Sequence, residues 1–273
     1  MIEGLNIRCN IGPVELLRSP LIELVYKRRA VLTRALVQIP DSEGAVRTAL
    51  AVGQTMKIRF GYRAGSGSLW HEWQGTVEGL DQPDKGSQAP DALMVRGSGL
   101  EKALMTTVVT ESFYGETAQS VAKRLLSRTG LPVGAVDIPG DVLPHQVFSR
   151  VPVARAIKQL ETTLKRAYGH DLSKYALWLG ANGLMWSDGP EPGEVYLIET
   201  AHNLLDHTPP LKAGEMGTVV SVLLPGLTAS RMVKIRDKRR GIVALERAEE
   251  VKHVLGAGGN STTVLYGKQV GWG

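Results

Sequence analysis

The residues of this chain that could perform acid–base or metal chemistry are scattered along it. None of the histidines belongs to the H-E-x-x-H spacing, which places two imidazoles and a general base on one helix face. The only suggestive group is His202 and His207, which flank Asp206 and could ligate a metal. A structural or surface role is the favoured interpretation, so we predict no metal site. The six histidines are His71, His145, His170, His202, His207 and His253.

Nucleophile and nucleotide motifs are also missing from the sequence. Residues 65–69 contain the glycines of a nucleophile elbow, but they lie between two predicted strands and no helix follows them. Residues 256–259 are glycine-rich, yet they precede a strand, whereas a phosphate-binding loop requires the N-terminus of a helix. We therefore predict that the protein is not an enzyme and binds no cofactor.

The single cysteine and the hydropathy pattern limit the class of protein. Cys9 is the only cysteine, which excludes an intrachain disulfide and a cysteine-based zinc site, and it is expected in the first strand as a small core residue. No segment has the ~20 consecutive apolar residues of a membrane helix. The N-terminus lacks the basic start and apolar run of a signal peptide. We expect synthesis in the cytoplasm and no membrane partner.

The formal net charge of +5 is concentrated towards the C-terminus. Beyond Pro210, ten basic residues face five acidic ones, so this end is the candidate for an electrostatic contact. Residues 236–241 lie between two strand patterns and are interpreted first as a solvated hairpin tip. The alternative is contact with a phosphate or an acidic partner, although nucleic-acid binding would require aromatic residues or a known motif beside the charges. The candidate contact residues are Arg236, Lys238, Arg239 and Arg240.

The elements that must position these residues are mostly strands. Short runs of branched and alternating residues, separated by Gly and Pro, predict a closed antiparallel barrel or sandwich at each end of the chain. The N-terminal runs are Leu21–Tyr26, Ala30–Ile39, Thr55–Tyr62, Leu69–Leu80, Ala92–Gly97 and Leu104–Phe113. The later runs are Glu194–Glu199, Thr218–Leu224, Arg231–Asp237, Gly241–Arg247, Glu250–Leu255 and Ser261–Tyr266.

Two helices interrupt this pattern in the middle third. Thr117 is a good N-cap for an apolar face of period 3.6, and Gly130 follows as a left-handed stop. A second helix is predicted from Pro152 to just before Gly169.

A hairpin is expected after the second helix, because an Asn-Gly pair at residues 182–183 lies between two apolar runs. Trp178 and Trp186 would then pair across this hairpin. The fold class is thus mainly β with an α+β insert: two antiparallel β-barrel domains flank a helix-containing domain.

The order of these elements resembles one family. It is a β block, a strand into residues 113–122, a helix ending at Thr129-Gly130-Leu131, a second helix after residues 148–152, and the hairpin at residues 177–186. Residues 224–227 (Leu-Pro-Gly-Leu), 250–255 and 262–266 follow in the C-terminal block. This order is similar to the tail hub proteins of contractile phages, the late control protein D group. That group is related to hub components of type VI secretion and contractile injection systems.

The resemblance implies a homotrimer with two tube-like barrels per subunit, which make a pseudo-sixfold ring. The ring joins a sixfold tail tube to a threefold spike in the virion tail baseplate, and DNA passes through its lumen without sequence-specific binding. Implied partners are the tail spike protein, the tail tube or distal tube-initiator protein, and the tape measure protein. The expected domains are residues 1–112 (first barrel), 113–206 (inserted domain) and 207–273 (second, smaller barrel), with the basic C-terminal surface facing neighbouring subunits or the lumen.

Two other functions remain open from the residues. One is a nucleic-acid-binding β-barrel protein that uses the basic C-terminal end and binds in a salt-dependent way. The other is a tail-associated cell-wall hydrolase with an unrecognised site that involves His202 or His207. A plain tail-tube subunit would have no need of the helical insert.

Overall fold

The computed structural model describes residues 3–16, 21–29, 32–64, 67–81, 91–212, 214–256 and 259–267. They form two compact units. Unit 1 contains the chain up to Lys27, Thr33–Leu100 and the chain from Gly193 onwards. Unit 2 contains a short segment that starts at Arg28, and Glu101–Pro192. The expected Ala30–Ile39 strand, the glycine loops at residues 65–69 and 256–259, and the ends of the chain lie partly outside the described residues.

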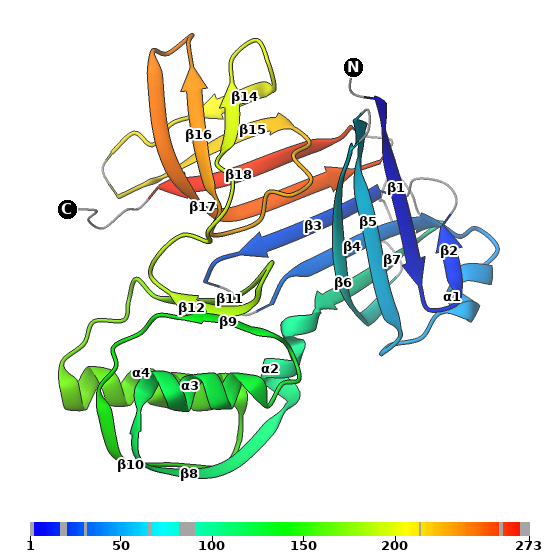
Figure 1. Ribbon diagram of the computed structural model, residues 1–273. Helices are drawn as coiled ribbons and strands as arrows, with labels where there is room; N and C mark the ends of the chain where they lie inside the picture. Colours follow the sequence, from blue (N-terminus) through cyan, green and yellow to red (C-terminus); the bar gives the residue numbers. More distant parts are fainter. Residues whose placement is uncertain are drawn as a thin grey trace. The chain divides into compact units, whose positions relative to one another are not determined.

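Unit 1 is built from strands of both ends of the chain (Figure 1). Its N-terminal elements are β1 (Glu3–Ile11), β2 (Val14–Leu16), β3 (Leu21–Lys27), β4 (Arg34–Pro40), α1 (Ala45–Ala49), β5 (Thr55–Ala64), β6 (Gly67–Asp81) and β7 (Ala92–Gly99). Its C-terminal elements are β13 (Tyr196–Glu199), β14 (Leu204–Thr208), β15 (Met216–Val222), β16 (Met232–Asp237), β17 (Ile242–Leu255) and β18 (Ser261–Gly267).

Within the described residues, these strands form one 13-stranded sheet in the order β14-β15-β18-β17-β3-β4-β7-β6-β5-β1-β2. β16 pairs with β17, and β13 runs parallel to β16. The antiparallel pairing of β17 with β3, from Glu250 opposite Lys27 to Leu255 opposite Ile22, joins the N-terminal strands to the C-terminal ones. The two β blocks therefore share one sheet and one hydrophobic core.

Strand alternation positions this core as the sequence predicts. In β5, Met56, Ile58 and Phe60 are buried while the residues between them are exposed. Cys9 lies buried in β1, as expected. Burial raises the pKa of its thiol to about 12, so the thiol stays protonated at neutral pH.

Unit 2 packs two helices against short sheets. Its elements are a 3-10 turn (Leu100–Lys102), α2 (Ala103–Thr106), β8 (Val108–Thr117), α3 (Ala118–Ser127), β9 (Val133–Val136), β10 (Val142–Pro152), α4 (Val153–Tyr168), β11 (Ala176–Gly180) and β12 (Gly183–Ser187). β8 pairs with β10, and β11, β12 and β9 form a three-stranded sheet. A separate core cluster joins the apolar faces of α3 and α4.

The predicted helix ends are confirmed. The Thr117 hydroxyl accepts the backbone N–H of Ser120 at 3.2 Å, and Gly130 has the left-handed φ of 75° expected after α3. Pro152 is the N-cap of α4, and Gly169 ends that helix with a φ of 76°. Both helices could be predicted because their start and stop signals are local.

Three expectations for local structure are wrong. Residues 104–106 are helical rather than the start of a strand, because Leu104 is buried in the core of unit 2 as part of α2. Gly180 pairs with Gly183, so Ala181 and Asn182 form the turn instead of Asn-Gly. Gly241–Arg247 and Glu250–Leu255 are one strand, β17, whose pairing to β18 shifts register between Ala248 and Glu250.

The two tryptophans of the β11–β12 hairpin do not pair with each other, contrary to expectation. Trp178 lies opposite Met185, whereas Trp186 lies opposite Leu177. Because the residue opposite Trp178 is next to Trp186 in the chain, the two indoles lie on opposite faces of the sheet. Trp186 joins the core of unit 2, and the Arg28 guanidinium lies over the Trp178 ring at 4.7 Å.

The fold class is confirmed as mainly β with an α+β unit. The division at residues 112/113 and 206/207 stays a prediction. Among the described residues, no helix is long and apolar enough to span a membrane.

Two histidines are held in the interior of unit 1. The His253 Nε2–H donates to the Leu227 carbonyl at 2.8 Å, and its Nδ1 contacts the Thr262 hydroxyl at 2.9 Å. His71 contacts the Tyr26 hydroxyl at 2.9 Å. Burial and the charge of His71 lower the pKa of His253 to about 3, against the opposing effect of the Leu227 carbonyl. Burial and Arg231 lower the pKa of His71 to about 4, with Glu72 opposing.

Acid should therefore destabilise unit 1 well above the pH range in which carboxylates titrate. A histidine with a lowered pKa binds its proton mainly after unfolding, so stability falls as pH drops below the unfolded value of about 6.5. For His253, we expect a loss on the order of 2 kcal/mol between pH 7 and 5, measured as the free energy of unfolding in urea. His253→Gln should flatten this slope, and the exposed His202→Gln should leave it unchanged. An equal slope in the wild type and in His253→Gln would contradict the prediction.

Candidate functional site

The four basic candidates lie at one hairpin. β16 and β17 pair as far as Asp237 opposite Ile242, so residues 238–241 form the connecting loop and Gly241 has a φ of 65°. The predicted hairpin at residues 236–241 is confirmed. We call Arg236, Lys238, Arg239 and Arg240 the basic hairpin tip.

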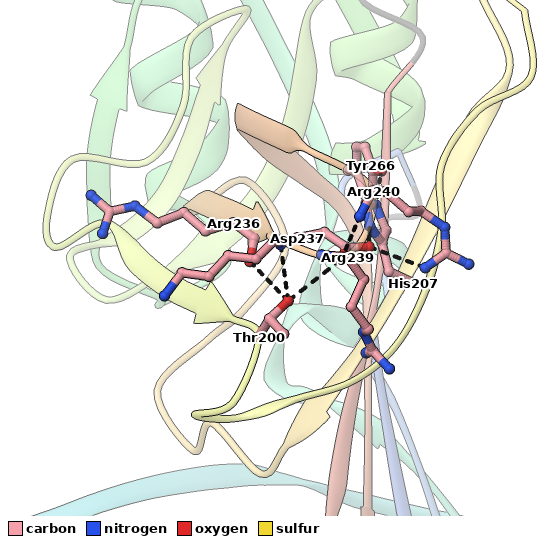
Figure 2. Close-up of polar contacts among 8 residues, drawn as sticks. Thr200, His207, Arg236, Asp237, Arg239, Arg240 and Tyr266 are labelled. Atoms are coloured by element: carbon pink, nitrogen blue, oxygen red, sulfur yellow. Dashed lines mark hydrogen bonds and ion pairs between the residues drawn. The ribbon is translucent and has the colours of Figure 1, made fainter.

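A buried carboxylate, Asp237, organises the tip (Figure 2). Its side chain is 0% exposed. Its Oδ1 accepts the backbone N–H of Arg239 at 3.0 Å and that of Arg240 at 3.3 Å, and lies 3.4 Å from the Thr200 hydroxyl. Its Oδ2 accepts a hydrogen bond from the Arg240 guanidinium at 3.1 Å. The loop is thus tied to β16 by the side chain of that strand's last residue.

His207 joins Asp237 to Tyr266. Its Nδ1 lies 2.9 Å from Asp237 Oδ2, and its Nε2 lies 2.6 Å from the Tyr266 hydroxyl. A carboxylate can only accept, so Nδ1 carries a proton and donates it to Asp237. In the neutral ring, Nε2 then accepts from Tyr266. These hydrogen bonds between His207, Asp237 and Tyr266 link β14, β16 and β18.

The surroundings of Asp237 and Tyr266 set the protonation states of these two side chains. Burial acts to raise the pKa of Asp237, but hydrogen bonds from His207 and Arg240, and from the Arg239 and Arg240 backbone, outweigh it and lower the pKa to about 2. Burial, with the nearby Glu246 and Asp237, raises the pKa of Tyr266 to about 12. Asp237 is therefore ionised and Tyr266 protonated at neutral pH.

Carboxylates pair with most of the cations of the basic hairpin tip. Lys238 Nζ lies 3.0 Å from Glu199, and Arg236 lies 4.0 Å from the same carboxylate. Arg240 pairs with Asp237. Within the described part of the chain, the exposed guanidinium of Arg239 has no ion-pair partner. Arg239 is therefore the cation most available to a partner.

The structure separates the residues suggested for a metal or for hydrolysis. His207 is buried in the network, whereas His202 and Asp206 are exposed. No group of metal ligands occurs among the described residues. The side chains of His207 and Asp237 are both 0% exposed, so this imidazole–carboxylate pair cannot reach a substrate. The network holds a loop in place.

Sequence reasoning missed Glu199, Thr200 and Tyr266. Tyr266 lies 59 residues from His207 along the chain, and Thr200 lies 37 from Asp237. Only the pairing of β13, β14 and β18 with their neighbours brings them together. The only available signal was an acidic residue within a run of basic ones.

Replacing the central carboxylate should loosen the loop. Asp237→Asn leaves the donors of Arg239, Arg240 and His207 facing an amide, so we expect a loss of about 2 kcal/mol in the free energy of unfolding at pH 7. The lowered pKa of Asp237 contributes its full stabilisation only above the pKa of an unfolded aspartate, about 3.9. The difference in stability between variant and wild type should therefore shrink as pH falls from about 4 to 2. Asp206→Asn, at an exposed carboxylate, is the matched control. Equal stability of Asp237→Asn and wild type at pH 7 would refute this role.

No protein family model and no curated relative matches this sequence. Solved structures do match. A tail protein from Neisseria meningitidis MC58 has a TM-score of 0.65 at 12% identity, covering 97% of each chain. The 43 kDa tail protein of prophage MuSo2 from Shewanella oneidensis has a TM-score of 0.61 at 10% identity, covering 96% of this chain and 97% of that one.

A third similar structure is an E. coli protein described as a component of the type VI secretion system. It has a TM-score of 0.59 at 10% identity, covering 97% of this chain and 77% of that one. At such identities the similarity establishes the fold. The chain has the fold of phage tail proteins and of this type VI secretion component, so the predicted resemblance to the tail hub family is confirmed at the level of the fold.

Proposed function

We propose that this chain is the hub subunit of a phage-type contractile tail. In this proposal three copies form a ring that joins the sixfold tail tube to the threefold spike, and DNA passes through its lumen. Its partners are the tail spike protein, the tail tube or distal tube-initiator protein, and the tape measure protein. The observation that carries the proposal is the pairing of β17 with β3, which puts two β blocks of one chain into one sheet.

This pairing supports the change of symmetry by simple geometry. If each copy contributes two β blocks to a ring, three copies supply six blocks to a sixfold tube and three identical faces to a threefold spike. The sheet path ends at β14 and β2 in the described residues, so these strands have unpaired outer edges. Such edges are an aggregation hazard unless something covers them, and a neighbouring subunit would do so.

The three-domain division belongs to the same proposal. Residues 1–112 and 207–273 would be the two barrels, and residues 113–206 the domain inserted between them. The insert distinguishes a hub from a plain tube subunit, which needs only the β blocks.

The basic hairpin tip would contact a neighbouring subunit or the lumen. Arg239 is its most available cation, and the Asp237 network fixes the loop that carries it. A fixed loop loses little conformational entropy when it binds. The rival functions gain nothing comparable at the tip or at His207, because carboxylates pair with the other three tip cations and His207 is buried.

The oligomeric state tests the proposal directly. We expect the purified chain to sediment at micromolar concentration with three times the mass of one chain. Class averages of the particle in electron microscopy should show a ring with threefold symmetry. A strictly monomeric chain would count heavily against the hub, and a hexamer would favour a plain tube subunit.

Reversing the charge of Arg239 tests the role of the tip. Arg239→Glu should weaken the trimer by about tenfold in dissociation constant, as expected for losing about 1.4 kcal/mol at an interface. Arg47→Glu, at an exposed arginine of α1, is the control for a change of net charge. A trimer that Arg239→Glu leaves as stable as Arg47→Glu does would remove the tip from the interface.

A further inference from the structure

A second cationic surface lies on the outward face of β1, β5 and β6, which run side by side in unit 1 (Figure 1). The register places Arg8 opposite Arg59, and Arg59 opposite Glu72. On either side of Arg8, Arg59 and Glu72, the next outward-facing positions of the three strands lie opposite one another in the same way. The face consists of Asn6, Arg8, Asn10, Lys57, Arg59, Trp70, Glu72 and Gln74, and we call it the β1–β5–β6 outer face.

Like charges meet at the centre of this face. Arg8 and Arg59 are direct cross-strand neighbours, an arrangement that destabilises a sheet. Glu72 is already engaged: its carboxylate lies 3.0 Å from Lys57 and 3.2 Å from Arg59, and it also accepts from Gln74. Within the described residues, Arg8 has no ion-pair partner. Glu15 of β2 lies opposite Asn10 on the same side of the sheet, but no ion pair joins it to Arg8 in the described part of the chain.

The remaining groups on the face are hydrogen-bond donors and one aromatic ring. Asn6, Asn10 and Gln74 each carry an amide N–H, in addition to those of the cations. The Arg59 guanidinium lies over the Trp70 ring, 5.6 Å from its centroid. Trp70 is only partly buried. Cations beside an aromatic ring are the combination that the basic hairpin tip lacks.

We propose that the β1–β5–β6 outer face binds single-stranded nucleic acid, with Arg8, Lys57 and Arg59 on phosphates and Trp70 against a base. Proteins that bind single strands without sequence preference combine a cationic surface with stacking aromatic side chains. A duplex hides its base faces and would leave Trp70 unused. An acidic protein is a weaker match, because Trp70 is the only large apolar side chain among the residues that form this face and protein interfaces have apolar centres.

Fluorescence anisotropy with a labelled oligo-dT of about 16 nucleotides tests this proposal on the full chain. We expect binding whose affinity falls steeply between about 50 and 200 mM salt. Arg8→Gln should weaken binding several-fold and reduce the salt slope by roughly 0.7, the value for one phosphate contact on a single strand. Because Arg8 has no ion-pair partner in the described residues, this variant should keep the fold. Trp70→Ala should weaken binding by about tenfold with an unchanged salt slope.

Arg47→Gln, at an exposed arginine of α1, is the matched control and should bind like the wild type. Absence of binding at about 50 mM salt would overturn the proposal, as would binding that neither Arg8→Gln nor Trp70→Ala alters. Heparin or duplex DNA that binds as tightly as oligo-dT would show an attraction to anions alone and would also overturn it. A chain that binds oligo-dT but does not form trimers would refute the hub and leave this inference standing.

Discussion

The antiparallel pairing of β17 with β3 is the contact on which the rest of unit 1 depends, because it closes the longest interval of the chain. It joins residues 22–27 to residues 250–255, and closing so long an interval of chain has a cost in conformational entropy. Two ion pairs lie beside it, Lys27–Glu250 at 2.9 Å and Lys252–Glu23 at 2.8 Å. Both are partly exposed and contribute little. The backbone ladder and the shared core beneath it stabilise the joint.

β17 also connects this joint to the hairpin tip. Its first half pairs with β16 and its second half with β18 and β3, with a shift of register between them. One strand thus carries the junction of the two β blocks and one side of the basic hairpin. At the tip, the Asp237 carboxylate fixes the loop through its hydrogen bonds, and His207 and Tyr266 connect that carboxylate to the sheet. A fully satisfied buried network of this kind makes a loop rigid.

The two cationic surfaces of unit 1 differ in how their charges are balanced. At the hairpin tip, Glu199 and Asp237 pair with three of the four cations. On the β1–β5–β6 outer face, Glu72 is shared between Lys57 and Arg59, and Arg8 is left facing Arg59. Each surface therefore keeps one cation that has no ion-pair partner among the described residues. The β1–β5–β6 outer face differs in that an aromatic ring, Trp70, lies beside its cations.

Local signals determined a large part of this protein. The Thr117 cap, the Gly130 and Gly169 stops and the apolar spacing specify α3 and α4, because helix signals act within a few residues. The alternation of Met56, Ile58 and Phe60 specifies which face of β5 is buried, because side chains in a strand alternate. Tertiary structure alone decided which strands pair. The pairing of β17 with β3, the meeting of His207 with Asp237 and Tyr266, and the position of Arg8 opposite Arg59 join residues 30 to more than 200 positions apart. No local pattern records such partners, because their proximity results from sheet registers that the chain adopts only when the whole core has formed.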